Sequence, residues 1–138
     1  MNSQKEKCLV SACLTGLSTR YDGCSKPDSR CLRVLQDFDY IPICPEQLGG
    51  LPTPRSAAEL IGGDGRDVLQ GRARVVTVDG IDVTNAFLSG ARAVLKIARD
   101  QNITLALLKA KSPSCGLTPM VGVTAALLER HGIRVVEY

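Results

Sequence analysis

The segment LVSACLTG, residues 9–16, is an apolar run that ends in a cysteine and a glycine-marked turn. The run LVSA is typical of a strand that is buried on both faces of a parallel sheet. The segments YIPICPE, residues 40–46, and LLKAKSPSCG, residues 107–116, repeat this pattern. In an open parallel sheet, ligands bind in the crevice beyond the carboxyl ends of the strands. The thiols expected at this crevice are those of Cys13, Cys44 and Cys115.

Strand and helix patterns alternate along the whole chain. Buried strands are predicted at residues 7–12, 40–44, 103–111 and 133–138. Helices are predicted at residues 29–38, 55–63, 82–98 and 123–132. Residues 45–54 are predicted as a loop, and residues 72–84 as a strand with an Asp-Gly turn that favours an edge hairpin. The alternation predicts a single three-layer α/β domain over residues 1–138, with a mostly parallel sheet.

The composition fits one small domain. With 138 residues, of which 44% are hydrophobic, the chain has enough apolar surface for one core. The net charge of +3 comes from 17 basic and 14 acidic residues that are scattered along the chain, which argues against a large nucleic acid as partner. No stretch reaches the roughly 18 apolar residues of a membrane span, and MNSQKEK at residues 1–7 lacks the apolar region of a secretory signal. We therefore expect a cytoplasmic protein without a membrane partner; the sequence predicts no particular oligomeric state.

The chain has six cysteines, and without a secretory signal these are better explained by metal binding or catalysis than by disulfides. No two of them form a CxxC pair, and the shortest gap runs from Cys8 to Cys13, so any site must be assembled by the fold. Three thiolates suit zinc or an iron–sulfur cluster, and an open fourth position is typical of a catalytic site. The single histidine, His131, falls in the last turn of the final predicted helix, where the helix dipole explains its presence.

The other three cysteines lead to different predictions. Cys8 falls at the opposite end of the first strand from Cys13, and Cys31 lies within a helical pattern, so both are predicted to be packing residues. Cys24 follows the turn YDG, which could approach Cys13, and is therefore a candidate fourth ligand. For any strand-end cysteine taken alone, a buried packing role is the ordinary interpretation.

Polar residues accompany the strand-end cysteines. Glu46 stands two residues after Cys44 in a shaped turn, which makes it a candidate general base, with a solvated loop carboxylate as the alternative. Ser112 and Ser114 precede Cys115, and their hydroxyls could orient a substrate, although helix capping is the commoner use. Basic residues of the same loops could bind a phosphate or a carbonyl, with surface solvation as the alternative. These basic residues are Arg20, Arg55 and Lys111.

Several longer strings identify a family. SACLTG, RYDG, CPEQLGGLPTPR, DVTNAFLSGA, LLKAKSPSCG and GVTAALLERHGI closely resemble the thiouracil desulfidase family of bacterial proteins, and the resemblance covers nearly the whole chain. It implies a Rossmann-like α/β domain that binds a 4Fe-4S cluster through three cysteines, which fall on Cys13, Cys44 and Cys115. It also implies that Glu46 and Ser112 are linked to catalysis.

The reaction that the resemblance implies is a non-redox, hydrolytic desulfurisation. Its substrate is a small thiolated pyrimidine, thiouracil or its nucleoside or nucleotide. The iron without a protein ligand binds the thiocarbonyl sulfur, water attacks the polarised carbon, and sulfide is left on that iron. Glu46 would move the proton from water or to the ring nitrogen, and Ser112 would hold the polar edge of the heterocycle or relay that proton. We expect Ser114, Arg20 and Arg55 to bind the substrate.

The chain departs from the family pattern in two places. Only LTPMV, residues 117–121, separates SPSCG from the GVTAALL helix, where family members have a longer stretch that contains glycine and aromatic residues; this would remove a lid or a substrate wall. Cys24 follows RYDG, where a small or polar residue is more usual, and its binding to the cluster would close the open iron. The alternative function is therefore a non-catalytic iron–sulfur or metal-binding module, a sensor or a sulfur carrier. A thiol-based redox enzyme is disfavoured because the chain has no CxxC pair and no neighbouring histidine base.

Overall fold

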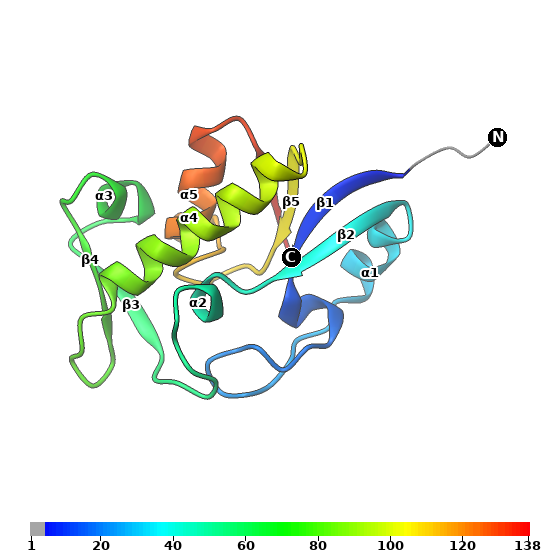
Figure 1. Ribbon diagram of the computed structural model, residues 1–138. Coiled ribbons are helices and arrows are strands. Elements are labelled where there is room, and N and C mark those ends of the chain that lie inside the picture. Colours follow the sequence, from blue (N-terminus) through cyan, green and yellow to red (C-terminus); the bar gives the residue numbers. More distant parts are fainter. Residues whose placement is uncertain (1–4) are drawn as a thin grey trace.

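The computed structural model describes residues 5–138, so part of the MNSQKEK stretch, and with it part of the argument against a secretory signal, lies outside the described residues. Within them, four parallel strands form the central sheet in the order β2-β1-β5-β6 (Figure 1). Their bounds are β1 Glu6–Ser11, β2 Phe38–Ile43, β5 Leu105–Leu108 and β6 Arg134–Glu137. Ser11 is paired with Ile43, so β1 and β2 end at the same edge of the sheet. Cys13 and Cys44 follow there.

The central sheet is covered on both faces. The helices beside it are α1 Ser29–Leu35, α4 Thr84–Asp100 and α5 Val123–Arg130 (Figure 1). Leu9 of β1 packs into a core that it shares with α4 and α5, whereas Cys8 and Val10 pack into a core that they share with α1. Successive residues of a strand face opposite sides, so this apolar run buries both faces of the sheet. The predicted three-layer Rossmann-like α/β fold is confirmed.

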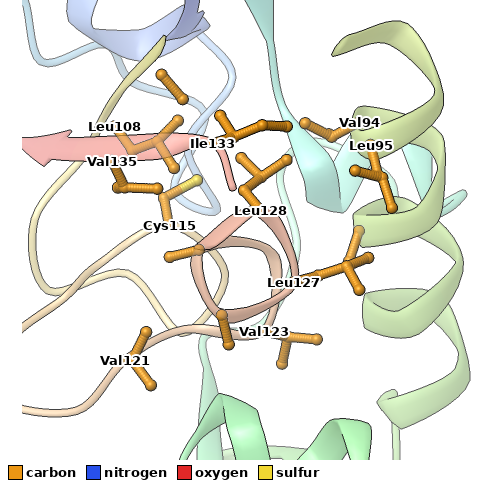
Figure 2. Packing of buried hydrophobic residues seen from close by; sticks show 14 of the residues in the cluster. Val94, Leu95, Leu108, Cys115, Val121, Val123, Leu127, Leu128, Ile133 and Val135 are labelled. Atoms are coloured by element: carbon orange, nitrogen blue, oxygen red, sulfur yellow. The ribbon is translucent and has the colours of Figure 1, made fainter. Parts of the chain in front are cut away.

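The two long helices bury apolar faces against each other and the sheet. On α4, Asp82 Oδ1 accepts the N–H of Thr84 at 2.9 Å, which satisfies one of the free amides at the start of the helix. Figure 2 shows Val94 and Leu95 of α4 facing Leu127 and Leu128 of α5. The apolar periodicity of both segments is therefore explained by the core. No helix among residues 5–138 is both long and apolar enough to cross a bilayer.

The segment 55–63 is not the predicted helix. It contains strand β3 (Ala58–Ile61), which pairs antiparallel with β4 (Arg74–Thr77) in a separate two-stranded sheet. Ala58 and Leu60 are partly buried against the main core, and the residues that alternate with them are more exposed. This period of two and the pairing with β4 override the local helical pattern.

The hairpin predicted within 72–84 is present only in part. Its Asp-Gly turn forms, and Gly80 donates its N–H to Thr77 O at 2.9 Å. Beyond the turn, however, the pairing is a single bridge between Val76 and Asp82, with N–H donation from Thr77 to Ile81 O at 2.8 Å and from Val83 to Val75 O at 2.9 Å, and helix α4 begins directly afterwards at Thr84.

The stretch 45–54, predicted as a loop, begins with a one-turn helix, α2 (Pro45–Leu48). Pro45 occupies the first helical position, where an N–H would have no helical partner, and Cys44 O accepts the N–H of Leu48 at 3.0 Å. Proline therefore starts a helix here rather than marking a loop. A further short helix, α3 (Gly65–Leu69), follows β3.

Helix α2 lies directly on α4 because two glycines face each other. A Cβ atom on Gly90 would lie 1.9 Å from Pro45 O, and a Cβ atom on Gly49 would lie 3.3 Å from Gly90 N. Only the absence of side chains allows the two backbones this approach. The glycine pair thus sets the position of α2, and with it the positions of Cys44 and Glu46.

Candidate active site

A cavity of about 630 Å³ lies at the edge of the sheet where β1, β2 and β5 end. This volume is in the range of about 300–1,000 Å³ that is common for ligand sites. The cavity is lined by the turn after β1, the start of α2 and the loop after β5. The lining residues that the sequence singled out are Cys13, Cys44, Cys115, Glu46, Ser112, Arg20, Arg55 and Lys111.

The three cysteines reach the cavity from three different strands. Cys13 lies in a single-turn 3₁₀ helix after β1, Cys44 directly precedes α2, and Cys115 lies in the turn after β5. Cys13 and Cys115 are 7% and 4% exposed, and Cys44 is half-buried. Figure 2 shows Cys115 among core residues, beside Leu108 and Val135. The structure brings together the thiols that the sequence places at strand ends.

Burial opposes the ionisation of two of these thiols. It raises the pKa of Cys115 to about 12, and it raises the pKa of Cys13 because desolvation outweighs the opposing charges of Lys109 and Arg20. Both thiols are therefore protonated at neutral pH, and a bound metal would displace their protons. Among residues 5–138, no three His, Cys, Asp or Glu side chains stand close enough to hold a single metal ion.

Glu46 is held between two donors in the first turn of α2. Its Oε1 accepts a hydrogen bond from Arg55 Nε at 2.9 Å, and its Oε2 accepts one from Ser114 Oγ at 3.1 Å. The Arg55 and Glu46 side chains are 7% and 15% exposed, so they form a largely buried ion pair. Glu46 therefore has a defined orientation two residues from Cys44, as a positioned general base requires.

Ser112 and Ser114 make different contacts. Ser112 Oγ accepts the N–H groups of Ser114 and Cys115, each at 3.1 Å, and so shapes the turn that carries Cys115. A hydroxyl has two acceptor lone pairs and one donor hydrogen. Since both acceptor sites of Ser112 are used, its O–H is left to donate to a group in the cavity. Ser114 is 1% exposed, and its O–H is directed to Glu46.

Several cationic side chains line the cavity together with Arg55. In the described part of the chain they are Arg20, Lys26, Lys109 and Lys111. Lys111 has a φ of +65°, a left-handed conformation that is uncommon outside glycine. Lys26 and Lys109 were not among the residues predicted from the sequence. Lys109 alternates with Lys111 at the end of one predicted strand, and this alternation could have placed both side chains on the cavity side. Lys26 is placed only by the loop after β1, where its backbone N–H donates to Cys13 O at 2.9 Å.

The remaining cysteines lie away from the cavity lining. Cys8 and Cys31 are fully buried in the core on the α1 side, and burial raises the pKa of each to about 11. Cys24 is exposed, and its N–H donates to Asp22 Oδ1 at 3.0 Å. All six cysteines are free thiols.

The short loop 117–121 is anchored to the last strand. Glu137 Oε2 accepts the N–H of Leu117 at 2.8 Å, and its Oε1 accepts the hydroxyl of Thr118 at 2.7 Å. Burial acts to raise the pKa of Glu137, but the hydrogen bonds from Thr118 and Leu117 outweigh it, so the pKa is lowered. The cavity is formed without lining residues from this loop.

The fold and the site define a parallel α/β protein with a ligand cavity beyond the carboxyl ends of its strands, around which three thiols, an ion-paired carboxylate and several cations gather. The particular family follows from comparison with known proteins. The chain belongs to the 2-thiouracil desulfurase family, whose model matches residues 8–138. The family resemblance stated from the sequence is thereby confirmed.

Two similar proteins cover almost the full length. YbbK of Bacillus subtilis (strain 168), an uncharacterized protein, is 41% identical over 140 residues, and the match covers 93% of each chain. The solved structure of the 4Fe-4S-dependent thiouracil desulfidase TudS is 42% identical with a TM-score of 0.80, and it covers 96% of this chain and 91% of the TudS chain.

Proposed function

We propose that this chain is a desulfidase that uses a 4Fe-4S cluster to replace the sulfur of a thiolated pyrimidine with oxygen. The observation that carries the proposal is that Cys13, Cys44, Cys115, Glu46 and Ser112 line one and the same cavity. Family membership supports it, as does the likeness to a 4Fe-4S-dependent thiouracil desulfidase. The substrate is thiouracil or its nucleoside or nucleotide, and a cavity of about 630 Å³ has room for a molecule of this size.

The donor set suits a cluster. Soft thiolates favour iron–sulfur clusters, and in a 4Fe-4S cluster each cysteine binds a different iron, so the thiols do not converge on one atom. Three cysteine ligands, Cys13, Cys44 and Cys115, leave one iron without a protein ligand. When bound, the cluster supplies that iron as a Lewis acid with affinity for the soft thiocarbonyl sulfur.

The residues of the chain supply the rest of the chemistry. Glu46 takes a proton from the water that attacks the thiocarbonyl carbon, and returns it to the ring nitrogen or to the departing sulfur. Ser112 donates its O–H to the polar edge of the ring. Arg20 and Lys111 offer positive charge to a carbonyl or a phosphate. The C=S group and water become C=O and hydrogen sulfide, and no electron is transferred.

The test is the anaerobic content of iron and acid-labile sulfide in the wild type and in Cys13→Ala, Cys44→Ala, Cys115→Ala and Cys24→Ala. Turnover of thiouracil is measured beside it. We expect the first three variants to lose the cluster and the sulfide release. Cys24→Ala is the matched control, because Cys24 is an exposed cysteine outside the cavity lining, and it should keep both.

Other outcomes separate the alternatives. A cluster that requires Cys24, or a cluster without sulfide release from thiouracil, would favour the non-catalytic iron–sulfur module. Protein that binds no iron after anaerobic reconstitution would exclude both functions.

A further inference from the structure

The side chain of Arg55 is only 7% exposed, although arginine is usually a surface residue. Its Nε donates to Glu46 Oε1 at 2.9 Å. Its Nη1 donates to Thr53 Oγ1 at 2.8 Å and to Pro52 O at 3.2 Å. Two of the three guanidinium nitrogens are thus bound to α2 and to the segment that follows it.

The third nitrogen joins further elements. Nη2 donates to Thr19 O at 3.0 Å and contacts Cys44 Sγ at 3.8 Å. The backbone N–H of Arg55 also donates to Tyr21 O at 2.7 Å, which ties the loop after β1 to the same residue. A guanidinium has five N–H donors, and the contacts of Nε, Nη1 and Nη2 account for all of them. No donor of Arg55 is left for a substrate.

We propose that Arg55 is a positioning residue that fixes the Glu46 carboxylate relative to Cys44 and to the cavity wall. One planar, rigid group contacts both Glu46 and Cys44, so it sets their relative placement more tightly than two flexible side chains would. Glu46 has one hydrogen bond on each oxygen, from Arg55 and from Ser114, and cannot rotate without breaking one of them. The inference rests on the proposed function, because it assigns Arg55 to the chemistry of Glu46.

Loss of this positioning changes the rate rather than the affinity. Because the donors of Arg55 are all used within the protein, Arg55→Met should leave KM within about threefold of the wild-type value. Displacement of a catalytic group by about 1 Å costs on the order of 100-fold in rate, so kcat should fall by about 100-fold. Arg55→Lys keeps a cation near Glu46 without the guanidinium fork, and should recover about tenfold of that loss.

The experiment combines three measurements on Arg55→Met and Arg55→Lys: iron and acid-labile sulfide content, kcat and KM for thiouracil, and crystal structures of the cluster-free proteins. Arg72→Met is the matched control, because Arg72 forms an ion pair with Asp67 at 3.4 Å while its side chain is 67% exposed. We expect full cluster content in every variant, and wild-type kinetics in the control. In the Arg55→Met crystals Glu46 should have left Ser114, and in Arg55→Lys it should remain there.

A double-mutant cycle adds a readout that a purely structural role would not produce. Glu46→Asp shortens the side chain and removes its contacts with Arg55 and Ser114 together. If Arg55 acts through Glu46, Arg55→Met should lower the kcat of Glu46→Asp by less than about threefold. A loss that is as large as in the wild-type background would overturn the inference.

Three further results would overturn it: Glu46 still bonded to Ser114 in Arg55→Met crystals, loss of the cluster from both Arg55 variants, or a raised KM with unchanged kcat. If Arg55→Met does not fold, Arg55→Lys decides, since wild-type kcat in that variant would show that the guanidinium fork is not needed. A wild type that releases no sulfide from thiouracil would remove the proposed function. The crystal structures would then still decide whether Arg55 positions Glu46.

Discussion

The contact between α2 and α4 leaves no room for a side chain, which makes Gly90→Ala a direct probe of how the fold places the site. A Cβ atom on Gly90 would lie 1.9 Å from Pro45 O and 3.2 Å from Gly49 N. Cβ atoms essentially never come within 3.0 Å of another heavy atom. The two helices must therefore separate by about 1.1 Å, the difference between 3.0 and 1.9 Å, because a backbone carbonyl in a close-packed contact cannot turn aside.

Two opposing effects determine the stability of this variant. Alanine is more favourable than glycine in a helix interior by about 1 kcal/mol. Overpacking of a tight contact costs about 1–3 kcal/mol. Since the clash is with backbone, we expect the larger cost to dominate, and a net loss of about 1–2 kcal/mol in the free energy of unfolding. Helix α2 carries Glu46, so a shift of this size should also lower kcat on the order of 100-fold.

Urea denaturation of the cluster-free protein measures the free energy of unfolding, and thiouracil turnover reports on the site. Ser89→Ala is the matched control, because Ser89 is the exposed neighbour of Gly90 on α4. That variant should gain a few tenths of a kcal/mol from helix propensity and keep wild-type turnover. A Gly90→Ala protein that is at least as stable as the wild type, with unchanged turnover, would show that the α2–α4 contact does not place the site.

Three further predictions concern other parts of the molecule. The Glu137 carboxylate, whose pKa is lowered on folding, stabilises the fold above its unfolded-state pKa of about 4.3 and loses this effect as the pH falls through its folded-state pKa. The Tm difference between wild type and Glu137→Gln should thus be full at neutral pH and vanish in acid; a pH-independent difference, or an equal one in the exposed control Glu59→Gln, would contradict this. Cys8→Ala and Cys31→Ala should each lower the free energy of unfolding by about 1 kcal/mol in urea titrations and keep full iron content, whereas iron loss would identify a ligand. Ser112→Ala leaves two backbone amides without their acceptor and should cost about 1–3 kcal/mol in the same titration; unchanged stability would show that the amides find other partners.

The fold could be predicted where one local pattern had no competitor. The runs at 7–12 and 103–111 contain largely apolar stretches, CLV and ITLALL, which are typical of a strand within a covered parallel sheet. The helix at 82–98 was predictable because its apolar residues recur along one face. The prediction of a helix at 55–63 was wrong because a short run can satisfy both the helical and the strand period. Pairing with β4, which follows later in the chain, makes this segment a strand.

The candidate site could be predicted in its residues more than in its contacts. Cys13, Cys44 and Glu46 follow strand ends, and parallel strands end at one edge of a sheet, so their arrival at one cavity follows from the sequence pattern. The cluster ligands, the catalytic roles and the cytoplasmic location stay predictions. Arg55 was expected at the substrate, yet its donors are used within the protein, because its hydrogen-bond partners come from segments that only the fold brings together.

Local sequence patterns were enough to identify the buried parallel strands, the cysteines that follow them, and the family of the chain. These properties follow from local periodicity, turn residues and long motifs, which can be recognised without knowing which distant residues contact them. The contact of Ser114 with Glu46, 68 residues away in the chain, and the packing of α2 on α4 through Gly49 and Gly90 come instead from the assembled fold. Such hydrogen bonds and backbone contacts depend on atomic positions to within a few tenths of an ångström, and these positions are set by the packing of the whole core.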